Sequence, residues 1–417
     1  MLVLILKILI PFLIIFNILP LLIWAERKGS AYIQDRRGPN RAGIMGVRLG
    51  GLLHTIADVI KLLTKEDIIP AHVNKPFFIL APFLSLFVAC VTYAVIPFAH
   101  PLEIGGKAFV LQSADVNVGI LYILAMSSLG VFGVLLAGWS SNNKYSLLGG
   151  LRSSAQMFSY EIAVGLILLS VLLLGGSLTL SALVENQTEA VWKWNFIRQP
   201  LAGVLFITAL FAENNRIPFD LPEGESELVA GYHVEYSSMK FAMFFMAEYA
   251  HMIVNSALIA VLFFGGWQVP FMSTGFLRAN AETGLFVLLL AHGVLFMLIG
   301  FFLLKKFKAG KYGDRRDYEV LVFGLPLTVF GLALSLFTLL HGSFELSSAG
   351  QQIFAAVCQF GVFMLKILFF CWVFIWIRWT LPRFRYDQLM RLGWKVMIPL
   401  ALANVAVTAI YLLVRYG

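Results

Sequence analysis

The segment 284-GLFVLLLAHGVLFMLIGFFLL-304 contains 21 residues and no Asp, Glu, Lys or Arg. A helix of about 20 mostly apolar residues is long enough to cross the hydrocarbon core of a bilayer. Nine further apolar runs predict membrane helices at about residues 2–24, 77–98, 118–138, 160–180, 199–213, 239–264, 320–341, 353–377 and 397–414. The sequence therefore predicts an all-α polytopic membrane protein, with about ten transmembrane helices in a single membrane domain over residues 1–417.

The composition excludes a water-soluble protein. Hydrophobic residues make up 59% of the 417 residues and charged residues only 13%, whereas an average soluble domain carries about 25% charged residues. So few charges cannot cover the surfaces of the roughly three soluble domains that a chain of this length would form. The abundance of aliphatic and aromatic residues also excludes an intrinsically disordered chain.

Sequence motifs that bind metals, nucleotides or redox centres are absent. The three cysteines, Cys90, Cys358 and Cys371, form no CxxC pair, so zinc and iron–sulfur sites lack their usual ligands. The seven histidines show no metal-ligand spacing, and no glycine-rich nucleotide loop is present. We therefore expect no metal and no cofactor bound by this chain itself. Electrons or nucleotides would be carried by other chains.

The Lys and Arg residues predict the orientation, because cytoplasmic loops of membrane proteins are enriched in them. If the loop after the first helix is cytoplasmic, 24 of the 31 Lys and Arg residues fall on the cytoplasmic side. This bias predicts that both termini lie on the opposite side of the membrane. It also accounts for the net charge of +8 without a nucleic-acid partner.

One cytoplasmic segment, residues 49–66, has the pattern of an amphipathic helix. Its apolar residues follow helical spacing, and its opposite face carries His54, Asp58, Lys61 and Lys65. A helix with one apolar face and this many charges is typical of the membrane surface. We therefore expect a surface helix on the cytoplasmic side.

The acidic residues concentrate in the stretch 213-ENNRIPFDLPEGESELVAGYHVEYSSMKFAMFFMAEY-249. Seven of the chain's 23 acids lie there: Glu213, Asp220, Glu223, Glu225, Glu227, Glu235 and Glu248. The spacing of two between Glu223, Glu225 and Glu227 does not form one helical face. A folded loop that presents carboxylates and a loop that is acidic by chance both fit this pattern.

Glu161, Glu248 and Lys366 are charged residues inside predicted membrane helices. At 1.5 Å per residue, Glu248 lies about 15 Å and Lys366 about 18 Å from the cytoplasmic edge. Charges at such depth are costly and commonly mark ion pathways, with a partner in the bundle interior. The sequence therefore predicts a proton or charge relay. The alternative is a buried ion pair that only fixes helix packing.

Two basic segments have the features of folded docking surfaces. Residues 25–43 combine Lys and Arg with the turn signal Gly38-Pro39-Asn40. Residues 378–395 carry Arg383, Arg385 and the acid Asp387 among aromatic residues. Guanidinium groups pair well with the carboxylates of a docked protein, so we expect Arg383, Arg385 and Asp387 to contact a partner.

Together these stretches resemble the H subunit family of NADH-quinone oxidoreductase, the respiratory complex I. The N-terminal motifs are Ala25-Glu26-Arg27-Lys28, Arg37-Gly38-Pro39-Asn40, Ala57-Asp58, Lys61 and Lys65-Glu66, followed by Gly138-Trp139, Tyr145, Arg152, Gln156 and Ser159-Tyr160-Glu161. The later motifs are Glu213, Asn215-Arg216, Pro218-Phe219-Asp220, 223–229, Glu235-Tyr236, Ala247-Glu248-Tyr249, Lys366, Arg378, 382–390 and Trp394-Lys395. The resemblance covers residues 1–265 and 353–414.

The resemblance implies a subunit beneath the peripheral arm that forms much of the quinone cavity. Its motifs imply that the cavity is lined or supported by Arg27, Arg36, Arg37, Asp58, Arg216 and Phe219. They imply a carboxylate relay toward the proton pumps through Glu161, Glu213, Glu223, Glu225, Glu227, Glu235 and Glu248, to which the buried Lys366 is added. Quinone would be the substrate, while FMN and iron–sulfur clusters would belong to partner subunits.

The implied partners are the peripheral-arm iron–sulfur and quinone-site subunits, the small and antiporter-like membrane-arm subunits, and the lipid bilayer. The implied location is a bacterial cell inner membrane, with both termini periplasmic. The family usually has about eight spanning helices, so residues 268–350 are expected to be an inserted helix pair with a basic loop from Lys305 to Arg316. His54-Thr55 also departs from the expected Gln-Pro.

Two other functions remain as alternatives at this point. The first is the related membrane protein of an energy-converting hydrogenase, which lacks a Glu-Ser-Glu-Leu-Val block like that of residues 225–229. The second is an autonomous ion or proton transporter that uses Glu248 and Lys366. Such a transporter would work without partners and would not need the elaborate cytoplasmic segments.

Overall fold

The computed structural model describes residues 2–44, 47–104, 106–221, 229–305, 307, 318–342 and 344–416. Its helices are α1 (Leu2–Ile33), α2 (Leu53–Thr64), α3 (Lys75–Thr92), α4 (Gly119–Ser140), α5 (Lys144–Gly175), α6 (Leu180–Glu185), α7 (Asn195–Arg198), α8 (Pro200–Glu213), α10 (Ser238–Phe263), α11 (Thr274–Ala279), α12 (Ala281–Lys305), α13 (Glu319–His341), α14 (Ser348–Thr380), α15 (Tyr386–Arg391) and α16 (Ile398–Tyr416). The short turns η4 (Gly231–His233) and the π-helical Leu392–Met397 join some of them.

Eight helical stretches among the described residues are long and apolar enough to cross a membrane. They are α3 with its short extension to Val95, α4, α5, α10, α12, α13, α14 and the continuous stretch Tyr386–Tyr416. Each coincides with one of the apolar runs predicted above. The predicted all-α membrane architecture is therefore confirmed.

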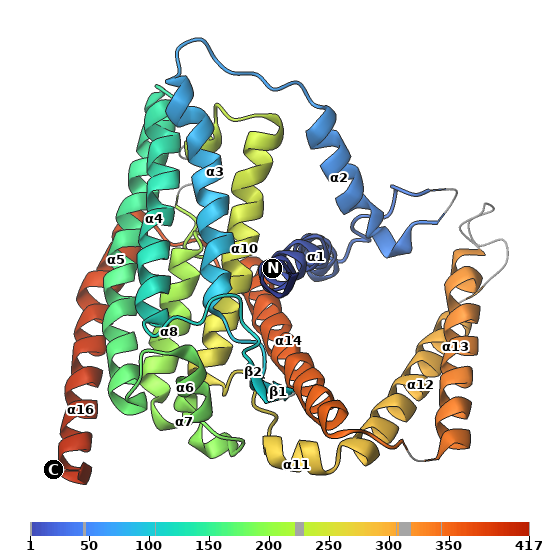
Figure 1. Cartoon of the computed structure of the whole chain (residues 1–417). Coiled ribbons are helices and arrows are strands. Elements are labelled where there is room, and N and C mark those ends of the chain that lie inside the picture. The colour runs from blue at the N-terminus through green and yellow to red at the C-terminus, as the bar shows by residue number, and fades with distance from the viewer. Residues whose placement is uncertain are drawn as a thin grey trace.

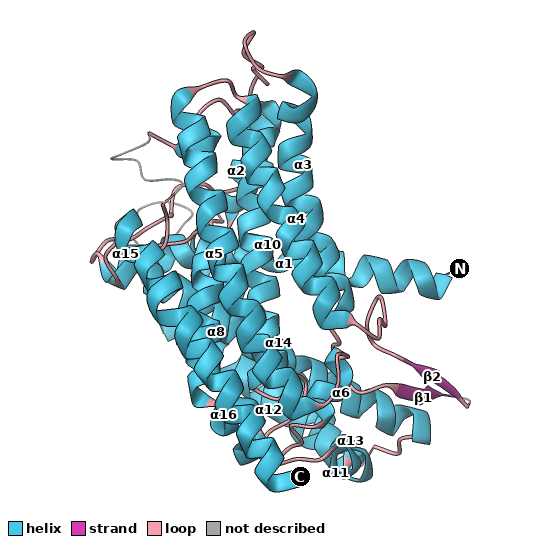
Figure 2. Ribbon diagram, turned by 90° about the vertical axis from the view of Figure 1, so that its left-hand side faces the viewer, coloured by secondary structure: helices cyan, strands magenta, loops and turns pink. Residues whose placement is uncertain are grey.

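The predicted runs at 2–24 and 199–213 are not among these eight helices. The run 199–213 forms α8, which has only 14 residues and a length of about 21 Å at 1.5 Å per residue. The run 2–24 belongs to α1, a helix of 32 residues. α1 is seen end-on in Figure 1 and lies horizontally in Figure 2, so it crosses the upright helices α3, α4 and α5 at a large angle.

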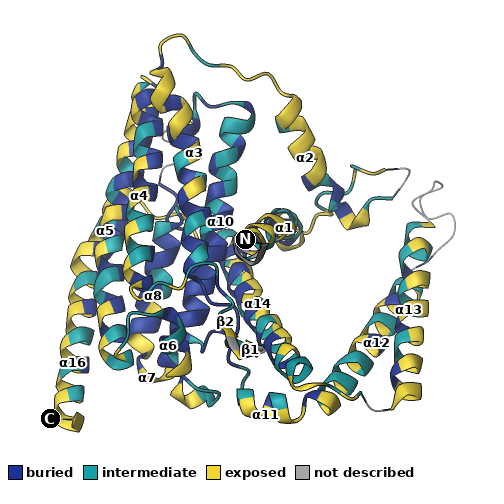
Figure 3. Cartoon of the chain, viewed as in Figure 1, coloured by how far each residue is buried: buried dark blue, intermediate teal, exposed yellow. Residues whose placement is uncertain are grey.

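α10 is the central element of the core. Its membrane-spanning window is 78% buried, and most of the helix is dark blue in Figure 3. Side chains of α1, α5, α8 and α14 pack with those of α10 in one large hydrophobic cluster. A helix that is apolar on all sides is buried on all sides, so the few polar groups of α10 face the interior of the protein.

α12 and α13 form a close-packed helix pair that stands apart from this core (Figure 1). Glycines make the close approach possible, because a Cβ atom on Gly331 would lie 2.5 Å from the Gly293 carbonyl oxygen and one on Gly300 would lie 2.7 Å from that of Gly324. The predicted segment 268–350 therefore contains two long helices. Whether it is an insertion stays a prediction.

The predicted surface helix at 49–66 corresponds to α2, which lies beside α1 and α10. Several of its apolar side chains, including Ile56 and Ile60, are exposed. The antiparallel strands β1 (Leu102–Ile104) and β2 (Lys107–Phe109) form a small hairpin that the sequence did not predict. It projects from the bundle in Figure 2.

Candidate functional site

A buried ion cluster joins α1, α10 and the loop after α8. Arg216 donates from Nη1 to Glu26 Oε2 at 2.7 Å and from Nε to Glu248 Oε1 at 2.6 Å. The Arg216 side chain is only 1% exposed. Burial lowers the pKa of its guanidinium, but Glu248 and Glu26 outweigh that effect and raise the pKa well above its ordinary value. Arg216 therefore remains a cation shared by two carboxylates.

Arg378 and Tyr249 complete this cluster. Arg378, at the end of α14, donates from Nη1 to the second oxygen of Glu26, and the Tyr249 hydroxyl donates to Glu26 Oε2 at 2.9 Å. The Arg216 guanidinium lies 4.2 Å from the centroid of the Tyr249 ring, a favourable cation–π distance. Glu26 therefore has three donors, and a change of charge at Glu26 would be felt directly at Arg216.

Contacts from α5 and from the C-terminal segment hold the loop that carries Arg216. Gln156 Nε2 donates to the carbonyl oxygens of Ala212 at 2.6 Å and Phe219 at 2.8 Å. Arg383 Nη2 pairs with Asp220 Oδ2 at 2.6 Å. Sequence motifs that are far apart, 213–220 and 382–390, thus form one folded unit.

A cavity of about 390 Å³ opens beside the ion cluster. Its walls come from α1, α2 and α10, with Arg378 of α14 at one side. Most of its lining is apolar, including Leu19, Ile23, Val59, Phe245 and Met246. Its polar groups are Glu26, Arg27, Thr55, Asp58, Lys61, Tyr249 and Arg378. An apolar cavity with a few convergent polar groups is typical of a small-molecule site.

The predicted quinone-cavity residues fall into three places. Arg27 and Asp58 form an ion pair and both line the cavity. Arg216 and Phe219 are buried and do not line this cavity, and Phe219 packs between the rings of Tyr160 and Phe384. Arg36 and Arg37 lie in the exposed loop after α1, where Arg37 lines a separate surface cavity of about 560 Å³ with Arg41 and Arg48.

The described acids of the predicted relay are spread along the interior. Glu161 accepts a hydrogen bond from the Ser128 hydroxyl, and Glu235 Oε1 accepts one from Asn143 Nδ2 at 2.7 Å. Glu213 and Glu248 line one internal cavity of about 50 Å³, and Glu213 also lines a second of about 20 Å³. Glu223, Glu225 and Glu227 lie outside the described residues.

Lys366 does not pair with Glu248. Its Nζ donates to the carbonyl oxygens of Phe264, Gly266 and Gln268 at 2.8–2.9 Å, and lies 4.7 Å from the centroid of the Trp194 ring. Phe264 follows Glu248 by 16 residues, about 24 Å along a helix. Lys366 thus binds carbonyls at the C-terminal end of α10, where a cation is favourable.

Replacing Lys366 with Met is expected to lower the free energy of unfolding by about 2–3 kcal/mol, because three buried carbonyl acceptors lose their charged donor. The thermal stability of the purified complex in detergent measures this effect. The loss should add to that of Glu248→Gln in a double-mutant cycle, with a coupling below about 0.5 kcal/mol. A larger coupling would contradict the separation of the two residues.

The predicted docking residues are only partly free for a partner. Arg383 is paired with Asp220 of its own chain, whereas Arg385 and Asp387 have side chains about 75% exposed and lie 3.9 Å apart. Among the residues that the structure describes, no group of three or more His, Cys, Asp or Glu could hold a metal ion.

Sequence reasoning missed Glu26, Tyr249 and Arg378 as site residues, although all three stood within the motifs quoted for the resemblance. It also missed His251 and Asn255. Glu248, His251 and Asn255 are spaced by three and four residues, which places them on one face of α10. A polar stripe on an otherwise apolar helix was the signal available.

Comparisons with known proteins identify the family of this chain. The family model "NADH dehydrogenase" matches residues 5–311 and 318–409. An H-type NADH-quinone oxidoreductase protein of Solibacter usitatus is 43% identical over 95% of this chain and 93% of its own length. "NADH-quinone oxidoreductase subunit 8" of Rhodothermus marinus is 44% identical over 96% of both chains, and the H-type protein of Salinibacter ruber is 43% identical over 94% and 90%.

These matches run over nearly the whole chain, and they support this family over the hydrogenase protein and the autonomous transporter. The residues of this chain that the family model matches include those that form the ion cluster and the cavity. The chain therefore belongs to the NADH dehydrogenase family and is a multi-pass membrane subunit, of the H type, of bacterial NADH-quinone oxidoreductase.

Proposed function

We propose that this chain forms the quinone cavity of the complex together with peripheral-arm subunits, and couples quinone reduction to proton pumping through buried carboxylates. The observation that carries the proposal is the position of Glu26. The Glu26 carboxylate lines the 390 Å³ cavity and shares Arg216 with Glu248, and Glu248 lines the internal 50 Å³ cavity.

The lining of the 390 Å³ cavity suits a quinone, which has an apolar tail and a polar ring. Leu19, Ile23 and Met246 offer an apolar wall for the tail, and Tyr249 and Arg378 offer donors for the ring oxygens. Electrons would come from an iron–sulfur cluster of a partner subunit, as the resemblance implies. FMN would likewise belong to a partner.

The coupling step is a competition for Arg216. Reduction of a quinone consumes two electrons and two protons, and negative charge that develops in the cavity would attract the Arg216 and Arg378 guanidiniums. Arg216 would then bind Glu248 less tightly, and an unpaired buried carboxylate takes up a proton more readily. That proton would reach Glu248 through the other acids of the relay, Glu161, Glu213, Glu223, Glu225, Glu227 and Glu235, while Lys366 would hold the end of α10 in place.

The remaining features of the proposal concern the assembly. The chain is a single membrane domain in a cell inner membrane with both termini periplasmic. Exposed Arg385 and Asp387 would contact a peripheral-arm subunit, and the exposed apolar faces of α12 and α13 would contact lipid or membrane-arm subunits.

Substitution of a cavity-lining side chain tests the quinone site. Val59 lines the cavity and is 49% exposed, whereas Ile60, the next residue of α2, is 56% exposed and does not line it. Val59→Trp should therefore raise the KM for quinone about tenfold, the loss expected when about 1.4 kcal/mol of binding is removed, and Ile60→Trp should leave it unchanged.

Quinone-linked turnover of the purified complex, measured over a range of quinone concentrations, gives this KM. Electron transfer from NADH to a water-soluble acceptor controls for an intact peripheral arm. Equal KM values for Val59→Trp and Ile60→Trp would show that quinone does not use this cavity.

A further inference from the structure

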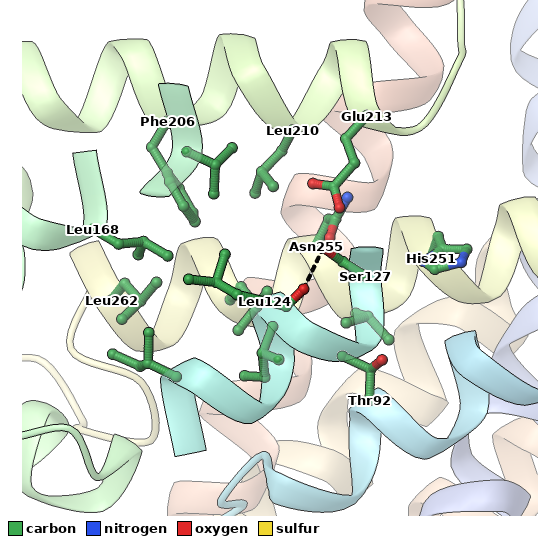
Figure 4. Close-up of a pocket in the computed structure, with 15 residues that line it drawn as sticks. Thr92, Leu124, Ser127, Leu168, Phe206, Leu210, Glu213, His251, Asn255 and Leu262 are labelled. Atoms are coloured by element: carbon green, nitrogen blue, oxygen red, sulfur yellow. Dashed lines mark hydrogen bonds between the residues drawn. The ribbon is translucent and has the colours of Figure 1, made fainter. Parts of the chain in front are cut away.

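His251 lies at the wall between two internal cavities. It is on α10, where its neighbours Ala250 and Met252 are completely buried, yet its own side chain retains accessible surface. That surface faces the cavities of about 20 Å³ and 50 Å³, because His251 lines both of them. Figure 4 shows the smaller cavity, with His251 and Asn255 of α10 near Glu213 of α8 and Ser127 of α4.

Both cavities have the size and polarity to hold water. A buried water needs about 10–15 Å³ of accessible volume and two to four polar partners, so the smaller cavity fits one water and the larger fits about three. Ser127, Glu213 and Asn255 are polar residues of the smaller cavity. Asn214, Asn215 and Glu248 are polar residues of the larger one.

Two polar atoms at the larger cavity have no partner within the described part of the chain. Asn214 Nδ2 and Asn215 Oδ1 are buried there without a hydrogen bond. A buried polar group without a hydrogen bond costs about 1–3 kcal/mol. Two such groups around one cavity, which His251 also lines, therefore favour ordered water inside it.

We propose that His251 is a positioning residue that holds water between Glu213 and Glu248. The inference rests on the proposed function and deepens it, because it supplies the link between two carboxylates that do not touch. A proton leaves the carboxyl oxygen of Glu213 for a water held by His251, and that water gives a proton to the Glu248 carboxylate. One O–H bond breaks and one forms at each transfer, so no other reactant is needed.

Two substitutions at His251 separate water binding from packing. His251→Asn keeps a hydrogen-bonding side chain beside the cavities, whereas His251→Leu keeps the bulk and loses the hydrogen bonds. In the purified complex, proton-pumping quinone turnover should fall about tenfold in His251→Leu, with a larger solvent isotope effect, and stay within about twofold in His251→Asn. His292→Asn, on α12 and outside both cavities, is the control.

Gly130→Ala tests the same water without changing His251. A Cβ atom there would lie 3.7 Å from His251 Nε2 and 3.5 Å from Val88 Cγ1, so it fits without a clash but occupies space in the larger cavity, which Gly130 lines. We expect turnover to fall about threefold, because displaced water is not replaced. Gly165→Ala meets no atom within 4 Å and should have no effect on turnover.

The outcomes distinguish this inference from the proposed function. Turnover lost in His251→Leu and Gly130→Ala but kept in His251→Asn supports held water. Equal loss of turnover in His251→Leu and His251→Asn overturns the role of held water. Normal turnover in His251→Leu, together with a defective Glu248→Gln enzyme, overturns it as well. Neither result contradicts the carboxylate relay. If His251→Leu does not assemble, the turnover of Gly130→Ala compared with that of Gly165→Ala tests the inference. Equal turnover in these two variants overturns it. Normal pumping in Glu248→Gln would overturn the relay itself.

Discussion

Replacing Arg216 with Met is expected to destabilise the protein by about 3–5 kcal/mol, the usual effect of removing one partner from a buried ion pair. Arg216 is the donor between Glu26 and Glu248, and its side chain is 1% exposed. Without it two buried carboxylates would face each other, and only Arg378 would remain to neutralise them. We expect little assembled complex in membranes, which native gel electrophoresis and the thermal stability of detergent extracts would measure.

Arg27→Met is the matched control, because Arg27 also pairs with an acid but is 46% exposed. Exposed pairs contribute only about 0–1 kcal/mol, so this variant should assemble normally. Glu248→Gln in the Arg216→Met background should recover part of the lost stability by removing one unpaired charge. Equal stabilities of Arg216→Met and Arg27→Met would show that the buried cluster is not what joins α1 to α10.

Glu248→Gln should lower quinone-linked, proton-pumping turnover about tenfold or more, the scale of a lost proton-transfer group. The amide oxygen of Gln can still accept the 2.6 Å hydrogen bond from Arg216 Nε, so the helices should stay in place. The amide cannot take up and release a proton at neutral pH. The enzyme should therefore assemble but fail to couple, as measured by proton uptake in inverted membrane vesicles.

Glu185→Gln, at an exposed position of α6, is the control for changing a carboxylate to an amide and should turn over normally. Electron transfer from NADH to a water-soluble acceptor should remain unchanged in both variants, because it does not reach this chain. Normal proton uptake in Glu248→Gln would remove this residue from the relay.

Local patterns were sufficient to predict the long apolar helices, because each depends on residues close together in the chain. The apolar run at 284–304 predicted α12, and the spacing of apolar residues in 49–66 predicted α2. The run at 199–213 was harder to interpret, since a polar Asn-Asn-Arg sequence follows Glu213 and ends α8 after 14 residues. The helix α8 is apolar, as the run predicted, but it is shorter than a bilayer-spanning helix.

The site was predicted less completely than the helices. Glu248 and Lys366 were both recognised as buried charges, but their partners were not identified. Local spacing cannot reveal which residues meet when the partners lie far apart in the chain. Lys366 found carbonyls at the end of α10, and Glu248 found Arg216, while Glu26 entered the cluster from α1 without having been singled out.

The sequence by itself determined the solvent of this protein, its helices and the crowding of its acids near residues 213–248. These properties follow from composition and from periodicity within single helices. Only the tertiary structure decided which charges share a site, because Glu26 meets Arg216 across 190 residues and Arg378 across 352. Burying a charge is favourable only when its partner is placed within hydrogen-bond reach, and the packing of α1, α10 and α14 places it there.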